Sequence, residues 1–247
     1  MHKIQVRWDE SEVTEDMSEE DTLEEDEDSA SHGEAGMEED DTLNIQDLKI
    51  TLPERVMVLG GSESGKTTLI RHLVAQMQKH NRVACVWYIG SNSAEETWVP
   101  AKFRRAQVSK PLLDNIRKVQ RNKQFEGLHQ VIVIDDALSE SFHRDKWWNQ
   151  YISTCRHQNI SLIFGIQYLK GLSPTIRENV KTFYLAHTNN ATLKSLYELS
   201  SADDYYRWKK EFVYIGRGKP MLMNVSPSAE QELTKLVVSK LDPKDMK

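Results

Sequence analysis

The residues from Gly60 to Thr68 have the composition and spacing of a loop that holds the phosphates of a nucleotide. They read Gly60-Gly61-Ser62-Glu63-Ser64-Gly65-Lys66-Thr67-Thr68, which fits the pattern G-x-x-x-x-G-K-[ST]. Glycines let such a loop turn tightly, so that its backbone N–H groups point inward at the phosphates. The positive N-terminus of the following helix faces the phosphates as well. We expect Lys66 to reach the β- and γ-phosphates of ATP, and the hydroxyl of Thr67 to bind Mg²⁺. A chance glycine-rich turn is the alternative, but a random chain of this length would contain the pattern roughly one time in a hundred.

Two carboxylates, Asp135 and Asp136, follow the apolar run of residues 131–134. Four β-branched residues in a row are typical of a central strand, and its last residues lie at the carboxyl edge of the sheet, where open α/β sheets bind ligands. Asp135 is expected to hold Mg²⁺, directly or through water. Asp136 points to the other face of the strand and is placed to polarise the water that attacks the γ-phosphate.

Gln167 comes directly after a second apolar run, residues 160–166. An amide at the end of such a strand can orient the attacking water or sense the γ-phosphate. A glutamine that caps a turn is the alternative for this residue taken by itself.

The elements that position these residues alternate between strands and helices. This alternation predicts an α/β fold with a mostly parallel central sheet covered on both faces. The expected strands cover residues 56–59, 82–89, 131–134, 160–166 and 182–186, and the expected helices cover 67–80, 111–123, 145–157, 190–200 and 202–212. Towards the end of the chain we expect a hairpin of residues 213–217 and 221–225, followed by a final helix over 228–240.

The net charge of −6 conceals a strong asymmetry along the 247 residues. Residues 9–41 carry eighteen Asp or Glu and no Lys or Arg, whereas residues 42–247 carry 30 basic and 20 acidic side chains. So acidic a segment, almost without apolar groups, cannot offset its ordering entropy. We therefore expect residues 1–41 to be a disordered acidic N-terminal arm and residues 42–247 to be one ATPase domain. The arm is either a solvating tail, a competitor for a basic surface, or a site for a basic partner.

The most basic stretch of the domain is residues 102–123, which carries eight Lys or Arg and one acidic residue, Asp114. This stretch is either a solvated helix face or a contact for nucleic acid. Cys85 and Cys155 are the only cysteines, too few for a disulfide framework and typical of a reducing compartment. No apolar run approaches the roughly 20 residues of a membrane span. We expect a soluble intracellular protein.

The order of four segments, GGSESGKTT, VIVIDD, CRHQNISLIFGIQ and PTIRENVKTFYLAH, resembles the FtsK–HerA superfamily of DNA-pumping ATPases. Within it, the chain looks most like the poxvirus- and iridovirus-type virion DNA-packaging ATPases of large DNA viruses. The resemblance covers roughly residues 54–190. It implies a RecA-like core, ATP and Mg²⁺ as cofactors, a ring-shaped homo-oligomer, and ATP-driven translocation of viral DNA into capsids. It further implies work at the host-cell assembly site, in nucleus or cytoplasm or in the virion, and a capsid or portal-vertex partner.

The family's roles carry over by position. The matching residues are Lys66 and Thr67 of the loop, Asp135 for the metal, Asp136 for the water, and Gln167 at the strand end. The resemblance also implies an arginine finger that stabilises the charge developing on the γ-phosphate. Arg156, before the strand that ends at Gln167, and Arg177, after it, are the two candidates, and both are expected near the active edge of the sheet. Glu63 departs from the pattern, because an acidic side chain inside the loop would repel a triphosphate unless it points outward.

Two functions of other classes stay open beside the motor. One is a small-molecule kinase, although no compact arginine-rich lid follows Gln167 in the sequence. The other is a nucleotide-gated scaffold for capsid assembly, without turnover, in which the acidic arm would be the working part.

Deleting residues 9–41 should raise non-specific DNA affinity, because it removes eighteen negative charges from a chain whose remainder is net basic. The slope of log affinity against log salt should steepen, as more phosphate contacts become available. Titrating DNA at several salt concentrations measures both quantities. If both stay unchanged at low salt, the arm does not compete for the DNA surface, and a partner-binding role gains support.

Overall fold

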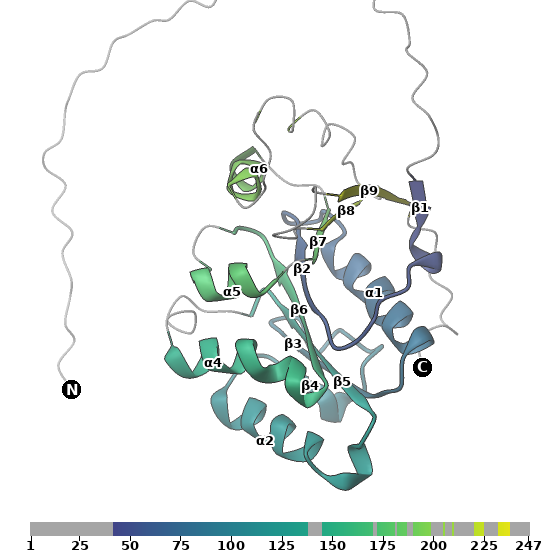
Figure 1. The fold of residues 1–247 in the computed structure, drawn as a ribbon, viewed down its shortest axis with the longest axis vertical. Coiled ribbons are helices and arrows are strands. Elements are labelled where there is room, and N and C mark those ends of the chain that lie inside the picture. Colours follow the sequence, from purple (N-terminus) through teal and green to yellow (C-terminus); the bar gives the residue numbers. More distant parts are fainter. Residues whose placement is uncertain are drawn as a thin grey trace, which may run out of the picture. The chain divides into compact units, whose positions relative to one another are not determined.

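A mostly parallel sheet of nine strands runs through the part of the chain that the computed structural model describes (Figure 1). The described residues are 42–137, 145–169, 172–180, 182–186 and 190–198, together with Tyr205, Lys209 and the segments 220–224 and 232–237. The predicted acidic arm therefore lies outside the described residues. Among the described residues, no helix is both long enough and apolar enough to cross a bilayer.

The strands are ordered β1-β9-β8-β7-β2-β6-β5-β3-β4 across the sheet. Their bounds are β1 Thr42–Asn44, β2 Arg55–Leu59, β3 Val83–Gly90, β4 Arg104–Arg105, β5 His129–Asp135, β6 Ile160–Ile166, β7 Thr182–Leu185, β8 Met221–Asn224 and β9 Glu232–Val237. Neighbouring strands are parallel except at β8, which is antiparallel to both β7 and β9. The predicted α/β class with a mostly parallel sheet is confirmed.

The central strands are the continuous apolar runs that the sequence predicts. Every residue of β2 and of β6 is buried, as expected for strands covered on both faces. The pairing register sets their ends side by side, with Leu59 opposite Ile166 and Asp135 opposite Gly165. The loop after β2, the two carboxylates at the end of β5 and Gln167 after β6 therefore lie at one edge of the sheet, the carboxyl edge.

Helices cover both faces of the sheet (Figure 1). Their bounds are α1 Lys66–His80, α2 Lys110–Gln120, α4 Lys146–Thr154, α5 Pro174–Asn179 and α6 Asn190–Tyr197, with short 3₁₀ helices η2 Ile45–Asp47, η3 Ala101–Phe103, η4 Lys123–Phe125 and η5 Cys155–Gln158. α1 packs Leu73 and Met77 against Val58 and Val133 on one face. α2, α4 and α5 pack on the other face, where Met57 and Ile132 lie. The side chains of each strand thus alternate between two cores.

Local sequence sets where several helices begin. Ser109 accepts a hydrogen bond from the backbone N–H of Leu112 at the start of α2, and Ser173 accepts one from Ile176 at the start of α5. These hydroxyls satisfy N–H groups that have no partner within the helix. The predicted helix 145–157 is shorter than expected, since α4 ends at Thr154 and a 3₁₀ turn follows.

The predicted final helix over 228–240 is wrong at its centre, where β9 forms instead. β9 pairs with β8 on one side and with β1 on the other, and Leu236 is buried in the core that α1 covers. Pairing with β1, almost 200 residues earlier in the chain, is a tertiary contact that outweighs local helical spacing. Of the predicted hairpin, the second strand is β8, while residues 213–217 lie outside the described residues, as does most of the predicted helix 202–212.

Candidate active site

The loop between β2 and α1 is held by its glycines and by the neighbouring strand. The backbone N–H of Gly60 donates to the carbonyl of Ile166, 3.1 Å away. A Cβ on Gly60 would lie 2.3 Å from Ser64 Oγ and 2.9 Å from the Cβ of Ala186, so a larger residue there would force its neighbours to shift. Gly65 has φ +90°, a left-handed conformation that glycine adopts without strain. Glu63 has φ 57°, so this departure from the motif also has an unusual backbone conformation.

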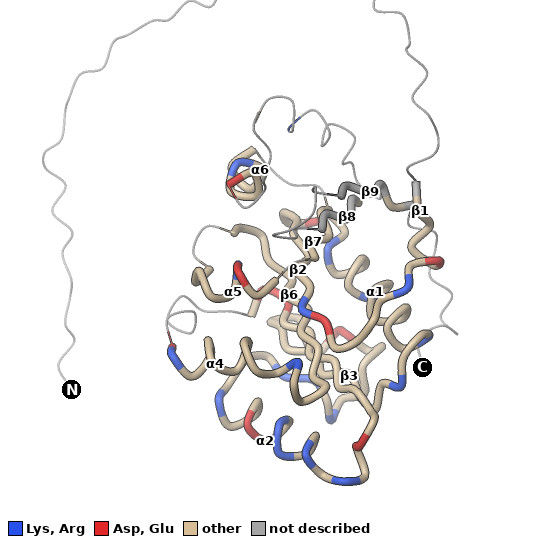
Figure 2. The backbone as a smooth tube through the Cα atoms, in the orientation of Figure 1, with Lys and Arg blue, Asp and Glu red and all other residues tan. Residues whose placement is uncertain are grey.

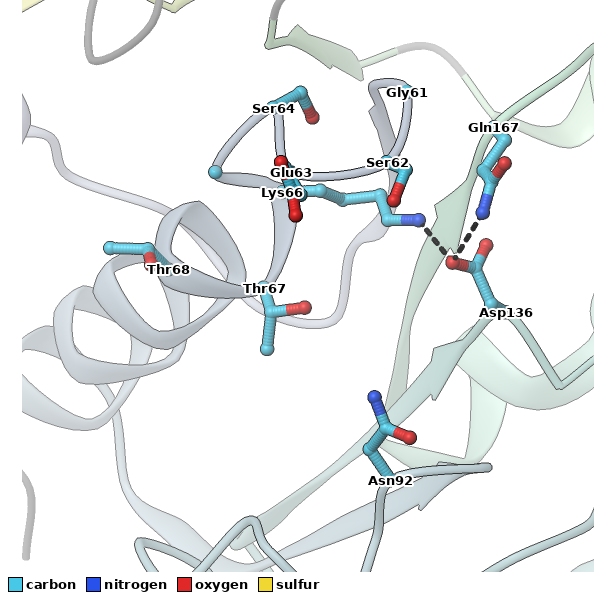
Figure 3. Close-up of a pocket in the computed structure, with 11 residues that line it drawn as sticks. Gly61, Ser62, Glu63, Ser64, Lys66, Thr67, Thr68, Asn92, Asp136 and Gln167 are labelled. Carbon is cyan, nitrogen blue, oxygen red and sulfur yellow. Dashed lines mark hydrogen bonds and ion pairs between the residues drawn. The ribbon is translucent and has the colours of Figure 1, made fainter.

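The loop forms one wall of a cavity of about 450 Å³ (Figure 3). The cavity is lined by residues 61–68, from Gly61 to Thr68, and by Asn92, Asp136 and Gln167. The three polar side chains come from the segments that follow β3, β5 and β6. Residues that the sequence predicts on separate motifs thus meet around one space.

Lys66 is the charged centre of this cavity. Its side chain is only 6% exposed, and its Nζ lies 2.5 Å from Asp136 Oδ2 and 3.8 Å from Asp135 Oδ1. Gln167 Nε2 donates to the same Asp136 oxygen at 3.2 Å (Figure 3). A phosphate that enters the loop therefore competes with Asp136 for the ammonium group of Lys66.

The backbone places Asp136 where these contacts can form. Asp136 has φ 49°, and its N–H donates to the carbonyl of Gly165 at 2.9 Å. The chain turns sharply at this residue, so the carboxylate of Asp136 faces the cavity while that of Asp135 stays buried. Asp136 is 37% exposed and Asp135 6% exposed. The two neighbouring carboxylates therefore have different surroundings.

Asp135 accepts two hydrogen bonds on one oxygen and, among the described residues, none on the other. Thr67 Oγ1 and the Tyr88 hydroxyl each donate to Oδ2 at 2.9 Å. Oδ1 is buried without a hydrogen-bond partner in the described part of the chain. A Cβ on residue 165 would lie 2.2 Å from this atom, so Gly165 is what leaves it room.

This arrangement suits a hard divalent cation. Burial raises the pKa of Asp135, while the positive charge of Lys66 and the hydrogen bonds from Thr67 and Tyr88 lower it. A buried carboxylate oxygen without a hydrogen bond, beside a threonine hydroxyl, is the oxygen chemistry that Mg²⁺ prefers. The described residues hold no cluster of three or more His, Cys, Asp or Glu. Mg²⁺ would therefore depend on phosphate oxygens and water for its other ligands, as it usually does.

Sequence reasoning missed two residues of this site, Tyr88 and Asn92. Tyr88 is buried, and its pKa is raised by that burial and by the charge of Asp135, so its hydroxyl stays protonated and donates. Asn92 points into the cavity from the turn after β3 (Figure 3). The only available signal was their position at the end of a predicted strand, because the sequence does not say that β3 lies beside β5.

The two candidate arginines lie away from the cavity of their own chain. Arg156 is in η5, which precedes β6, so it lies at the amino edge, about 20 Å along the strand from Gln167. Arg177 is in the last turn of α5. Two residues later, Asn179 accepts a hydrogen bond from Arg55 at the start of β2, so this end of α5 is also at the amino edge. The expectation that both lie near the active edge is wrong, whereas their role as finger stays a prediction.

Solved structures share this fold. The genome packaging NTPase B204 of Sulfolobus turreted icosahedral virus 2, in complex with ATP-gammaS, superposes with a TM-score of 0.53 at 14% identity, over 74% of this chain and 97% of that one. B204 of Sulfolobus turreted icosahedral virus gives 0.54 at 15% identity, over 74% and 98%. EssC from Geobacillus thermodenitrificans gives 0.51 at 14% identity, over 78% and 43%.

Comparison of the sequence finds one viral relative and one viral family. Uncharacterized protein 015R of Frog virus 3 is 29% identical over 148 residues, which are 57% of this chain and 46% of that protein. The chain thus matches about half the length of this relative. The family model of the poxvirus A32 protein matches residues 44–202, a range that contains every element of the cavity described above. The chain belongs to the poxvirus A32 protein family.

Proposed function

We propose that the protein is an ATPase that drives viral DNA into capsids, as one subunit of a packaging motor. The observation that carries this proposal is the convergence of Lys66, Asp136 and Gln167 on the loop-lined cavity, with the buried Asp135 3.8 Å from Lys66. The shared fold adds support, because the similar B204 is a genome packaging NTPase. We further propose that residues 1–41 form an arm separate from the ATPase domain of residues 42–247.

In this proposal the chain's own residues divide the work of hydrolysis. The N–H groups of residues 60–68 and the ammonium of Lys66 hold the triphosphate. Thr67 and Asp135 hold Mg²⁺, which when bound supplies positive charge against the phosphate oxygens. Asp136 takes the proton of the attacking water. At the same time the water oxygen bonds to the γ-phosphorus, and the bond between the γ-phosphorus and the bridging oxygen of the β-phosphate breaks. Gln167 orients that water.

Lys66 would change its ion-pair partner when a nucleotide binds. In the structure its ammonium pairs with Asp136. When phosphate oxygens take the ammonium, the Asp136 carboxylate loses this ion-pair partner and can accept a hydrogen bond from the attacking water instead. Nucleotide binding would therefore free the base that the next step needs.

A DNA partner is proposed from charge as well as from the family. Lys and Arg residues are frequent along the backbone of α2 and the segment after it (Figure 2). Some are occupied, since Lys110 pairs with Asp114 and Arg117 lies over the ring of Tyr151. Lys118 and Arg121 are exposed and available to phosphates. A homo-oligomeric ring and a capsid or portal-vertex partner are also part of the proposal.

The test of this function is ATP turnover with and without duplex DNA, read beside the mass of the oligomer. We expect hydrolysis that DNA stimulates, in an oligomer larger than a dimer, with Lys66→Ala as the control for contaminating ATPases. Transfer of phosphate to a small acceptor would show a kinase instead. Nucleotide binding without any turnover would show a scaffold.

Lys66→Ala and Asp136→Asn should separate binding from chemistry. Lys66→Ala should weaken nucleotide binding, because it removes the point charge on the phosphates. Asp136→Asn should still bind ATP but slow hydrolysis by about a hundredfold or more, since the water is no longer activated. Calorimetric binding and steady-state turnover measure the two effects. Asp114→Asn, the same change on the surface of α2, should alter neither. Equal loss of binding in the Lys66 and Asp136 variants would remove Asp136 from its role.

Hydrolysis should need a neighbouring subunit, because neither candidate arginine is near its own cavity. The Arg156→Ala, Arg177→Ala double variant and the Lys66→Ala variant should each fail to turn over. Rings mixed from the two should recover part of the activity, since some interfaces then pair an intact loop with intact arginines.

Mixing Lys66→Ala with Thr67→Ala is the control for this experiment. Both lesions lie on the same loop, so no site in such a ring is complete and no recovery is expected. Absence of recovery in the arginine mixture, with mixed rings shown to form, would exclude a finger supplied in trans.

A further inference from the structure

The hydrogen bond from Tyr88 to Asp135 lies outside the motifs that support the proposed function. β3 runs beside β5, with Tyr88 opposite Val133 and Gly90 opposite Asp135. The side chain of Tyr88 therefore reaches the end of the neighbouring strand, where its hydroxyl lies 2.9 Å from Asp135 Oδ2. Tyr88 is only 2% exposed, so water does not compete freely for this contact.

Two donors on one oxygen decide which way the carboxylate faces. Thr67 Oγ1 and the Tyr88 hydroxyl both donate to Asp135 Oδ2. The two oxygens of a carboxylate are equivalent, so these bonds do not choose between them, but both bonds hold the plane of the carboxyl group against rotation. Oδ1 is left beside Gly165 with no hydrogen bond among the described residues, and the ammonium of Lys66 lies 3.8 Å from it. Oδ1 therefore has no hydrogen bond to give up when a cation binds.

The Tyr88 ring is itself held in place. Trp98 packs edge-to-face against it, with ring centroids 5.9 Å apart. The indole N–H of Trp98 donates to Glu96, which also accepts two hydrogen bonds from Arg71, at 3.1 and 2.8 Å. Arg71 belongs to α1, the helix that begins with Lys66. The hydroxyl of Tyr88 thus has a fixed position relative to α1, the helix that carries Lys66 and Thr67.

We propose that Tyr88 is a positioning residue for the divalent cation of this site. It would act through Asp135, whose carboxylate its hydroxyl holds in one orientation, and it is not among the residues that line the cavity. This inference rests on the proposed function, since it assigns a role in a site that binds ATP with Mg²⁺. Hydrogen-bonding partners behind a metal ligand commonly change metal affinity by about ten- to a hundredfold when removed.

Tyr88→Phe tests this role, because it removes only the hydroxyl and keeps the ring against Trp98. We expect the affinity for Mn²⁺, measured by electron paramagnetic resonance with a non-hydrolysable ATP analogue bound, to fall by about tenfold. Binding of the same analogue in EDTA should stay as in the wild type, because the phosphate loop is intact. Steady-state turnover gives two further quantities. The Mg²⁺ concentration for half-maximal rate should rise by a larger factor than the factor by which the rate at saturating Mg²⁺ falls.

Tyr184→Phe is the matched control. Tyr184 is also 2% exposed and lies in the same core as Tyr88, on β7. Tyr184→Phe also removes a tyrosine hydroxyl, but one away from the carboxylate of Asp135, so the affinity for Mn²⁺ should not change. Thermal unfolding of both variants reports any common loss of stability.

Each outcome decides the proposal. Unchanged Mn²⁺ affinity in Tyr88→Phe would overturn it, and so would an equal loss in Tyr184→Phe. Loss of analogue binding in EDTA would assign Tyr88 to packing of the loop. Because metal and analogue binding are read without turnover, the result stands apart from the proposed function. A wild-type protein that binds both but never hydrolyses ATP would refute the ATPase and leave the role of Tyr88 intact.

Discussion

The pairing of one buried ammonium with two carboxylates is the interaction on which the site depends. Lys66 lies between Asp135 and Asp136, and a buried charge is tolerated only with such partners. The three residues come from α1 and from the end of β5, so the pairing requires the two segments to meet at one edge of the sheet. A triphosphate brings several negative charges to the same ammonium, which is how nucleotide binding and the state of Asp136 become linked.

Close packing surrounds two glycines at that edge of the sheet. Gly60 lies against Ser64, and Gly165 lies against the free oxygen of Asp135. A larger residue at either position would displace the loop or the carboxylate. These glycines are therefore part of the chemistry through the space they leave, while Gly65 serves through its left-handed backbone.

The arrangement of the arginines bears on how a ring would work. Lys66 is the cationic side chain among the described residues that line the cavity. Arg156 and Arg177 lie towards the opposite edge of the sheet. If a guanidinium stabilises the transition state, a neighbouring subunit would bring it. Hydrolysis would then depend on contact between subunits.

The sequence by itself determined the parts whose chemistry is local. The loop from Gly60 to Thr68 and the strands ending at Asp135 and Ile166 follow from short-range spacing and apolar runs, and the α/β class follows from their alternation. Tertiary structure decided what depends on which strands are neighbours. Tyr88 met Asp135 because β3 lies beside β5. Residues 232–237 became a strand because β1 and β8 flank them. Arg156 lay at the far edge because of the direction of β6. None of these contacts is encoded within a single segment, since each is a pairing between stretches far apart in the chain.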